Sequence, residues 1–351
     1  MWPFKGKGKE GELGELAGSC SSDKAAGKEA AFDTDPDPVL LCPGPNGLQK
    51  VLLTNAKGCT VEILLYGGQI ISWKDEYGED CLFMSKKASF TPPKAIRGGI
   101  PICFPQFGTY GHLETNGFAK HMTWTIEEDP PKILQKYPTP KTKSFVDLLL
   151  LPSQNTNRIY PYTWELRLRV ILGQNGNLTV IPRVRNMNLE KRDMMFTFAL
   201  QAHFNVSDVG EVRLEGLEAM DYYDHLNNNA RATEYGDALI FEKEVDKAYL
   251  ETPGKIAIID HAKRRTYVVF KEGLPDCVLW NPWDKQAKKL PDFGDKEFRN
   301  MLCLQPAIIE RPLKLKPGQE WTGRVHFTVV NSSYFSGPLQ PTRPSKPSID
   351  S

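Results

Sequence analysis

Hydrophobic and polar side chains alternate along many short stretches of this 351-residue chain. Residues 163–172, TWELRLRVIL, show the alternation most clearly. One face of this stretch carries Trp164, Leu166, Leu168 and Val170, and the other carries Glu165, Arg167 and Arg169. A period of two residues is typical of a half-buried β-strand. Turn-forming residues follow at 173–177 and an extended pattern resumes at 178–186, so the sequence predicts a hairpin with a five-residue loop.

Similar short runs recur along the chain, separated by Gly, Pro, Asn or Asp. They are VLLTN (51–55), TVEILLY (60–66), FVDLLLL (145–151), FTFAL (196–200), KIAII (255–259), TYVVF (266–270), CVLWN (277–281) and TGRVHFTVV (322–330). A helical period sustained over ten residues is hard to find between them. The pattern therefore predicts an all-β fold, a single large antiparallel β-sandwich of many strands.

The two ends of the chain differ from this β-rich part. Residues 1–38 contain few apolar groups and mixed charges, so they cannot bury enough surface to offset the entropy lost on ordering. We expect them to be disordered, and they differ from a transit peptide because they hold no arginine and eight acidic residues before position 38. Residues 332–351 are rich in Pro and Ser and are expected to form a flexible tail. The sandwich is predicted to span residues 39–331.

Charge and cysteine content exclude several classes of protein. The 44 basic and 43 acidic side chains give a net charge of +1, which favours neither nucleic acid nor an anionic membrane as a partner. No apolar run approaches the roughly 18 residues of a membrane-spanning helix, so no transmembrane segment is expected. Seven cysteines without a CxxC pair indicate reduced thiols rather than a disulfide framework. Without HExxH or CxxC spacing we predict neither a metal site nor a cofactor.

Six blocks, in order, carry a resemblance to a known family. They are YGGQIISW (66–73), PPKAIRGGIPICFPQFG (92–108), NGFAKHMTW (116–124), FTFALQAHFNVSD (196–208), WNPWDKQAKKLPDFGDKEF (280–298) and RPLKLKPGQEW (311–321). With them the chain resembles the glucose-6-phosphate 1-epimerase group of the aldose-epimerase (galactose mutarotase-like) superfamily, and the plant members most of all. The resemblance implies a large β-sandwich with a hexose 6-phosphate in a concave groove.

The family reaction needs two side chains that carry protons. A carboxylate takes the proton of the anomeric hydroxyl, and a protonated histidine delivers one to the ring oxygen. The resemblance places the histidine position at Gln201 and the base position at Gln305. Because an amide neither accepts nor releases a proton near neutral pH, we expect little or no epimerase activity. His203 shares a strand face with Gln201 and is a candidate replacement, although it lies roughly 6–7 Å further along the strand.

Four further residues are candidates for substrate binding. Arg97 in the IRGGIP block has the pattern of a sugar-phosphate contact, and the alternative is a structural ion pair beside a tight turn. Asn116 replaces a further family histidine, and Lys120 replaces a family arginine or is a surface lysine. Asp284 lies in the WNPWDK block, where Trp280 and Trp283 form either a wall of the groove or part of the core.

These observations lead to competing functional hypotheses. The resemblance to plant members implies a catalytically degenerate protein that serves as a subunit or accumulation factor of the chloroplast NADH dehydrogenase-like complex, with other subunits as partners. It would then lie on the stromal side of the thylakoid. The alternative is an active, cytoplasmic hexose-6-phosphate mutarotase. A third hypothesis is a sugar-phosphate sensor, in which the amides at positions 116, 201 and 305 bind hydroxyl groups and leave the anomers unchanged.

Overall fold

The computed structural model of the protein describes residues 38–109, 111–129, 144–189 and 192–331. The predicted disorder of residues 1–38 and the predicted flexible tail at 332–351 fall almost entirely outside these residues and stay predictions. The described chain is nearly all β-structure, which confirms the predicted fold class. Among the described residues, no helix combines the length and the apolar composition needed to cross a membrane.

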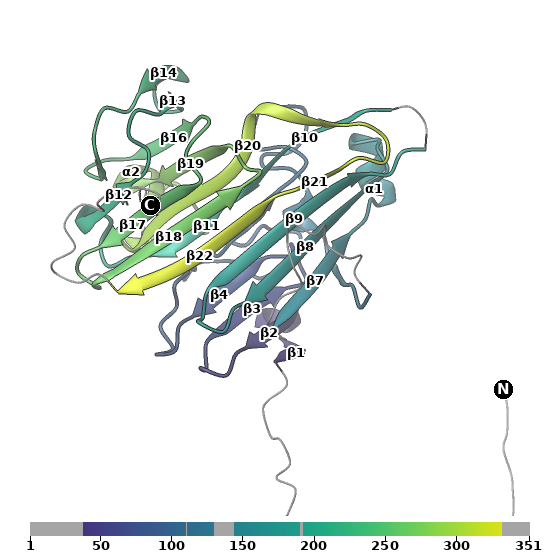
Figure 1. Ribbon diagram of the computed structural model, residues 1–351, viewed down its shortest axis with the longest axis horizontal. Helices are drawn as coiled ribbons and strands as arrows, with labels where there is room; N and C mark the ends of the chain where they lie inside the picture. The colour runs from purple at the N-terminus through teal and green to yellow at the C-terminus, as the bar shows by residue number, and fades with distance from the viewer. Residues whose placement is uncertain (1–37, 110, 130–143, 190–191, 332–351) are drawn as a thin grey trace, which may run out of the picture. The chain divides into compact units, whose positions relative to one another are not determined.

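The largest sheet has ten antiparallel strands (Figure 1). Their order is β15 (Leu239–Ile240), β12 (Val212–Glu215), β17 (Lys255–Asp260), β18 (Arg265–Glu272), β22 (Arg324–Asn331), β9 (Leu178–Asn186), β8 (Trp164–Leu172), β7 (Phe145–Leu150) and β6 (Thr125–Ile126), and β21 (Glu320–Thr322) also pairs with β9.

The second sheet has eight strands and carries the candidate site described below. Their order is β14 (Ala230–Thr233), β13 (Asp221–Asp224), β16 (Val245–Tyr249), β19 (Asp276–Asn281), β20 (Met301–Leu315), β10 (Met194–Leu200) and β5 (Ile102–Cys103), and β11 (Ala202–Asn205) also pairs with β20.

A four-stranded sheet and several short helices complete the described fold. The sheet has the order β1 (Val39–Pro43), β2 (Gln49–Thr54), β3 (Thr60–Leu64) and β4 (Ile70–Lys74). The helices are α1 (Gln154–Ile159) and α2 (Trp283–Ala287), with the 3-10 turns η1 (Pro45–Gly47), η2 (Ala119–His121), η3 (Val209–Glu211) and η4 (Glu297–Asn300).

Strands β8 and β9 form the hairpin that the alternating pattern predicts. Leu172 pairs with Leu178, and the amide of Gly173 donates to the carbonyl of Asn177 at 2.8 Å, which closes the five-residue loop. The apolar face of β8 is buried, while its polar face forms ion pairs on the outer side of the sheet. Arg169, for example, binds Asp147 of β7 at 2.8 Å.

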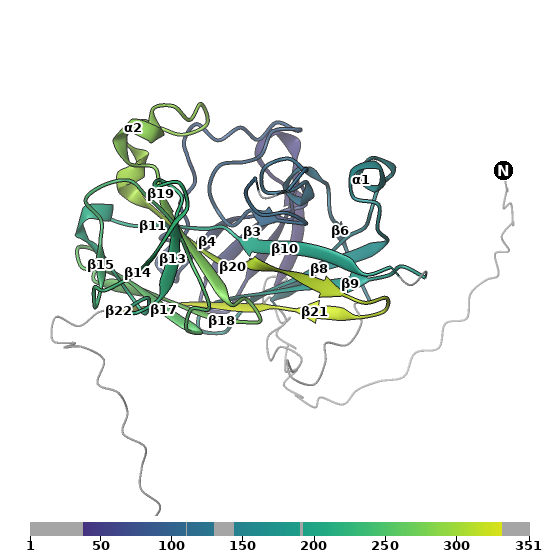
Figure 2. The same cartoon turned by 90° about the horizontal axis from the view of Figure 1, so that it is seen from above.

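The core lies between the ten-stranded and eight-stranded sheets. Leu166 and Val180 from the first sheet and Phe198 and Leu304 from the second belong to one buried cluster. Figure 2 shows β18, β22 and β21 along one side, β10 and β20 in the next layer, and α2 beyond them. Because alternate residues of each strand face this core, the remaining residues of the eight-stranded sheet face away from it.

Candidate functional site

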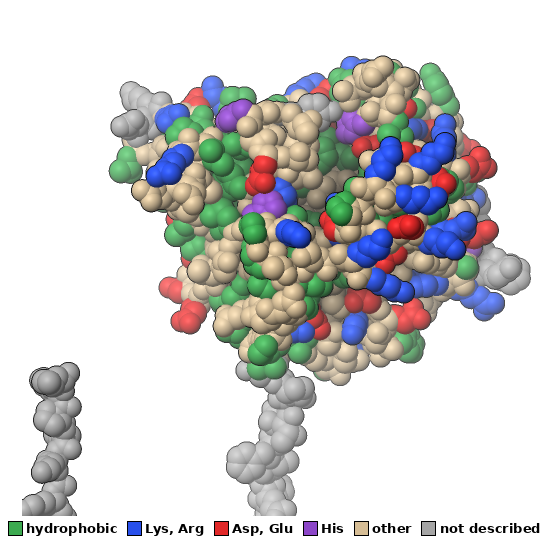
Figure 3. All heavy atoms as spheres, turned by 180° about the vertical axis from the view of Figure 1, so that it is seen from behind, with side chains coloured by type: hydrophobic (Ala, Val, Ile, Leu, Met, Phe, Trp, Pro, Cys, Tyr) green, Lys and Arg blue, Asp and Glu red, His purple; other side chains and the backbone are tan. Residues whose placement is uncertain are grey.

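The face of the eight-stranded sheet that points away from the core forms the floor of a pocket. Asp246 of β16 pairs with Trp280 of β19, Trp280 pairs with Cys303 of β20, and Val278 pairs with Gln305. Paired residues, and residues two apart on one strand, point to the same face of a sheet. All five line one pocket of about 460 Å³. Figure 3 shows the molecule from behind the view of Figure 1, with a hollow near the middle of this face.

Gln201 and Gln305 meet in this pocket. Gln201 falls between β10 and β11, and both of these strands pair with β20, which carries Gln305. The side-chain Nε2 of Gln201 donates a hydrogen bond to Oε1 of Gln305 at 2.9 Å. Gln305 is only 4% exposed and Gln201 is half-buried, so the bond lies at the partly buried floor of the pocket. The structure thus brings together two residues that lie 104 positions apart in the sequence.

Arg97 lines the same pocket and is also held in an ion pair. Its Nε lies 3.2 Å from Oδ2 of Asp292 and its Nη2 lies 3.3 Å from Oδ1, which is a two-point contact. The guanidinium also lies over the ring of Trp280, 5.9 Å from the ring centre. Gly99 follows at a φ of +62°, and a side chain there would clash with the carbonyl of Ile70 at 2.1 Å. The contacts with Asp292 agree with the structural ion pair considered from the sequence, and the position of Arg97 in the pocket leaves its role as a sugar-phosphate contact a prediction.

His203 lines the pocket as the sequence hypothesis required, but it is unsuited to donate a proton. It is 3% exposed, and its Nδ1 lies 3.0 Å from the carbonyl oxygen of Gly99. Burial, followed by the charge of Arg97, lowers the pKa of His203 to about 4. At neutral pH the ring is therefore uncharged, with Nδ1 donating to Gly99.

The other candidates from the sequence lie in different places. Asn116 lines the pocket with a φ of +65°, and its Oδ1 accepts from the amide of Gly108 at 2.8 Å. Lys120 turns its Nζ to the carbonyl oxygens of Thr115 and Gly117, and burial lowers its pKa. Neither Lys120 nor Asp284 is among the described residues that line the pocket.

The two tryptophans of the WNPWDK block have separate roles. Trp280 is part of the pocket wall and meets the ring of His203 edge-on, with 6.2 Å between ring centres. Trp283 packs instead against Phe298 of η4, with 5.3 Å between ring centres. Of the two alternatives from the sequence, Trp280 takes the place of a groove wall, and Trp283 is a partly buried residue that packs against the core.

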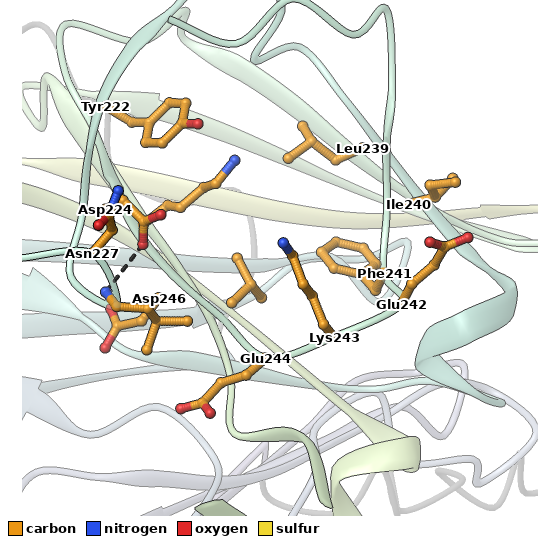
Figure 4. A pocket seen from close by; sticks show the side chains of 13 residues that line it. Tyr222, Asp224, Asn227, Leu239, Ile240, Phe241, Glu242, Lys243, Glu244 and Asp246 are labelled. Atoms are coloured by element: carbon orange, nitrogen blue, oxygen red, sulfur yellow. Dashed lines mark hydrogen bonds between the residues drawn. The ribbon is translucent and has the colours of Figure 1, made fainter. Parts of the chain in front are cut away.

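A larger hollow of about 620 Å³ lies beside β16, and Asp246 lines both this hollow and the pocket (Figure 4). Tyr222 and Asp224 lie on one side of it and Leu239 and Phe241 on the other. Lys247, which also lines it, is bound to Glu234 at 2.9 Å. Because Gln201, Gln305 and Arg97 line the smaller pocket instead, we place the candidate site there.

Comparison with known proteins now identifies the family. The aldose 1-epimerase family profile matches residues 49–328. This chain belongs to the aldose 1-epimerase family. A protein of Cenchrus ciliaris that is provisionally named glucose-6-phosphate 1-epimerase is 56% identical over 299 residues, which cover 85% of this chain and 90% of that protein.

Two further matches are more distant. A crystal structure of a provisionally assigned mutarotase from Salmonella typhimurium has a TM-score of 0.71 at 20% identity, covering 84% of this chain and 97% of that chain. The Arabidopsis thaliana protein named NDH-dependent cyclic electron flow 5 is 24% identical over 90 residues, which cover 26% of this chain and 23% of that protein. The first match supports the galactose mutarotase-like fold.

Two residues of this aldose 1-epimerase family pocket were not found from the sequence. His225 and Asp246 both line it, with Nδ1 of His225 2.7 Å from Oδ1 of Asp246. They come together because β13, which ends one residue before His225, pairs with β16. Only knowledge of this strand pairing would have revealed them. Among the described residues, no group of three or more His, Cys, Asp or Glu side chains is arranged to hold a metal ion.

Proposed function

We propose that this protein is a carbohydrate-binding member of the aldose 1-epimerase family that holds a hexose ring without interconverting its anomers. The observation that carries the proposal is the hydrogen-bonded amide pair, Gln201 and Gln305, at the positions where the resemblance places the acid and the base. The other lining residues include polar groups and an aromatic ring, which can bind a sugar without catalysing its anomer exchange.

Two amides at these positions cannot perform the proton transfers that anomer exchange requires. Opening the ring requires removal of a proton from the anomeric oxygen and delivery of one to the ring oxygen. Each proton carrier contributes on the order of 10²–10⁴ in rate, and an amide cannot replace it. His203 is uncharged at neutral pH because burial lowers its pKa to about 4, so it cannot deliver the proton.

The same amides are well suited to bind hydroxyl groups. A glutamine side chain both donates and accepts hydrogen bonds, as a sugar hydroxyl does. Asn116 adds a third amide, and Trp280 offers an aromatic ring beside them. Such a mixture of a few placed polar groups and aromatic surface is typical of small-molecule sites.

Nuclear magnetic resonance on the purified protein tests this proposal. We expect saturation-transfer difference signals from glucose or glucose 6-phosphate, which report binding. We also expect exchange between their anomers to stay at the rate of a protein-free sample. If the protein accelerates this exchange, and His225→Ala or Asp246→Asn abolishes the acceleration, the proposal is wrong. Proton transfer would then be assigned to His225 and Asp246.

We also propose a second role, as a component of the chloroplast NADH dehydrogenase-like complex. The partial match to the Arabidopsis protein named NDH-dependent cyclic electron flow 5 supports this role. A protein without catalysis at this site would act through binding to other subunits. In leaves that express a tagged form, the protein is expected to migrate with the complex on native gels of thylakoid membranes. Normal amounts of the complex in plants that lack the protein would contradict this role.

A further inference from the structure

We propose that the hollow of about 620 Å³ beside β16 docks an extended segment of a partner protein in which basic and apolar side chains alternate. We call this hollow the end groove, and its lining lies within residues 222–227 and 239–247. It is distinct from the pocket that holds Gln201 and Gln305, although Asp246 lines both. Docking in the end groove therefore does not depend on whether that pocket binds a sugar.

The end groove lies where the two large sheets end. Tyr222 and Asp224 reach it from β13, which with β14 forms the margin of the eight-stranded sheet. Leu239 and Ile240 reach it from β15, which is the last strand of the ten-stranded sheet. Figure 4 shows Tyr222 and Asp224 on one side of the hollow and Leu239 and Ile240 on the other. The end groove is thus an opening between the margins of the two sheets that enclose the core.

Apolar side chains connect the end groove to the core. Phe241 is 4% exposed and belongs to the main buried cluster, and Tyr222 and Leu239 pack against that cluster. Beside them, Leu226 is 50% exposed and Ile240 is 65% exposed. Large apolar side chains that stay in contact with water around a hollow are typical of a surface that a partner covers.

Strand β15 offers a backbone edge with which an extended segment can pair. Among the described strands it pairs only with β12, through Leu239 with Leu214 and Ile240 with Arg213. An edge strand of this kind binds a further strand through main-chain hydrogen bonds, and alternate side chains of that strand occupy neighbouring pockets. Lysine and proline, which commonly protect such edges, do not occur within β15 itself. The edge of β15 therefore favours an extended conformation of the docked segment.

Carboxylates in the end groove outnumber the lysines that balance them. The charged residues of its lining are Asp224, Glu242, Glu244, Asp246, Lys243 and Lys247. Lys247 is already paired, because its Nζ lies 2.9 Å from Oε2 of Glu234, which is outside the lining. Asp246 contacts His225 and is left out of the balance. Asp224, Glu242 and Glu244 then remain beside Lys243, so the end groove attracts a cationic partner.

Glu244 shows that negative charge is crowded in the end groove. Burial, followed by the charge of Asp246, raises the pKa of Glu244 above its ordinary value. The charge of Lys289 acts in the opposite direction and is the weaker of the two charges. A lysine or arginine side chain of a partner would offset the remaining repulsion and favour the charged form of Glu244.

Fluorescence anisotropy with labelled peptides and the full-length protein tests this proposal. The probe is a short peptide in which valine and lysine alternate. Replacing its lysines by glutamate removes the charge match, and replacing its valines by serine removes the apolar contacts. We expect the valine–lysine peptide to bind saturably and both altered peptides to bind at least about tenfold more weakly. Hydrogen exchange of the backbone amides in residues 238–242 should become slower when the valine–lysine peptide is bound, because it adds a strand to β15.

Reversal of two charges in the end groove gives a matched comparison. Glu242→Lys with Glu244→Lys should weaken binding of the valine–lysine peptide at least about tenfold. Glu76→Lys with Glu128→Lys makes the same change in net charge at two exposed glutamates outside the lining, and it should have little effect. The difference between these two double variants separates local contact from long-range attraction.

Failure of the valine–lysine peptide to bind would overturn the proposal, as would equal binding of the valine–glutamate peptide. Equal weakening by the two folded double variants, or unchanged hydrogen exchange in residues 238–242, would overturn it as well. Self-association of the protein that Ile240→Glu abolishes would assign the end groove to a second copy of the chain, again against the proposal. Each of these results leaves sugar binding at the separate pocket of Gln201 and Gln305 unaffected.

Discussion

Gln201 and Gln305 are the two side chains on which the proposed loss of catalysis depends, and they lie on or beside strands that the family fold retains. Both positions could be predicted from the resemblance to the family, since Gln201 falls inside the block at 196–208 and Gln305 falls between the last two blocks. The sequence also placed His203 on the same face as Gln201, since a strand repeats every two residues. The burial of His203, which lowers its pKa to about 4, could not be predicted from the sequence. The contacts of Arg97 with Asp292 and of His225 with Asp246 could not be predicted either. Those depend on strand and loop pairings between distant segments.

The buried His203 predicts a pH dependence of stability. Its pKa falls from 6.5 to about 4 in the folded protein, so the unfolded chain binds the proton first as the pH decreases. The free energy of unfolding should therefore decline between about pH 6.5 and pH 4, by roughly 3 kcal/mol from this residue alone. Above pH 6.5 the ring is neutral in both states and has no effect.

Denaturant unfolding at several pH values, in the unaltered protein and in His203→Phe, measures this contribution. The variant loses the hydrogen bond to Gly99, which shifts its stability by a constant amount. It should also lose most of the decline between pH 6.5 and pH 4, because phenylalanine does not titrate. Parallel curves for the two proteins would show that His203 does not carry the effect.

At the scale of elements, the β8–β9 hairpin was predictable and β20 was not. The hairpin has strict alternation on β8 and turn residues between its strands, and both are local signals. Strand β20 runs from Met301 to Leu315 and contains Pro306 and Pro312, which normally argue against a strand. It forms because β10, β11 and β19 pair with it, and that pairing leaves no trace in the local sequence.

The segment between β19 and β20 presents Asp292 to Arg97, and Asn281 fixes both of its ends. Asn281 is fully buried, and its Nδ2 donates to the carbonyls of Phe298 at 2.8 Å and Met301 at 2.6 Å. Its Oδ1 accepts from the amide of Trp283 at 2.9 Å. Asn281→Ala should lower the free energy of unfolding by roughly 2–4 kcal/mol, since it leaves buried backbone groups without partners.

Urea unfolding of Asn281→Ala checks this expectation against a nearby asparagine. Asn300 also bonds to backbone carbonyls, those of Val206 and Ser207, but it is exposed to solvent, so water can replace its bonds. Asn300→Ala should therefore cost about 1 kcal/mol or less. Equal losses in the two variants would contradict the structural role given to Asn281.

At the scale of the whole molecule, the large core controls access to the thiols. The described cysteines are free; five of the six are buried and Cys42 is partly exposed. Burial raises the pKa of Cys81 and of Cys277 to about 12, so each stays a protonated thiol at neutral pH. Such thiols should react only when the sandwich unfolds.

Reaction with a chromogenic disulfide reagent measures this protection. Cys20 lies outside the described residues, so the experiment uses a Cys20→Ser background, in which six cysteines remain. We expect one fast thiol, Cys42, and five that react at the rate of global unfolding. Several fast thiols under native conditions would show that the two sheets separate far more readily than their packing implies.

The central claim is that this family member binds a hexose and lacks only the side chains that carry protons. The most direct test restores them in the variant Gln201→His with Gln305→Glu and measures anomer exchange of glucose by NMR saturation transfer. We predict exchange at least about 10²-fold faster than with the unaltered protein, which should match a protein-free sample. The variant Gln201→Asn with Gln305→Asn, which keeps amides at both positions, should stay inactive. A restored variant that binds glucose but does not accelerate exchange, or an unaltered protein that is already active, would contradict the claim.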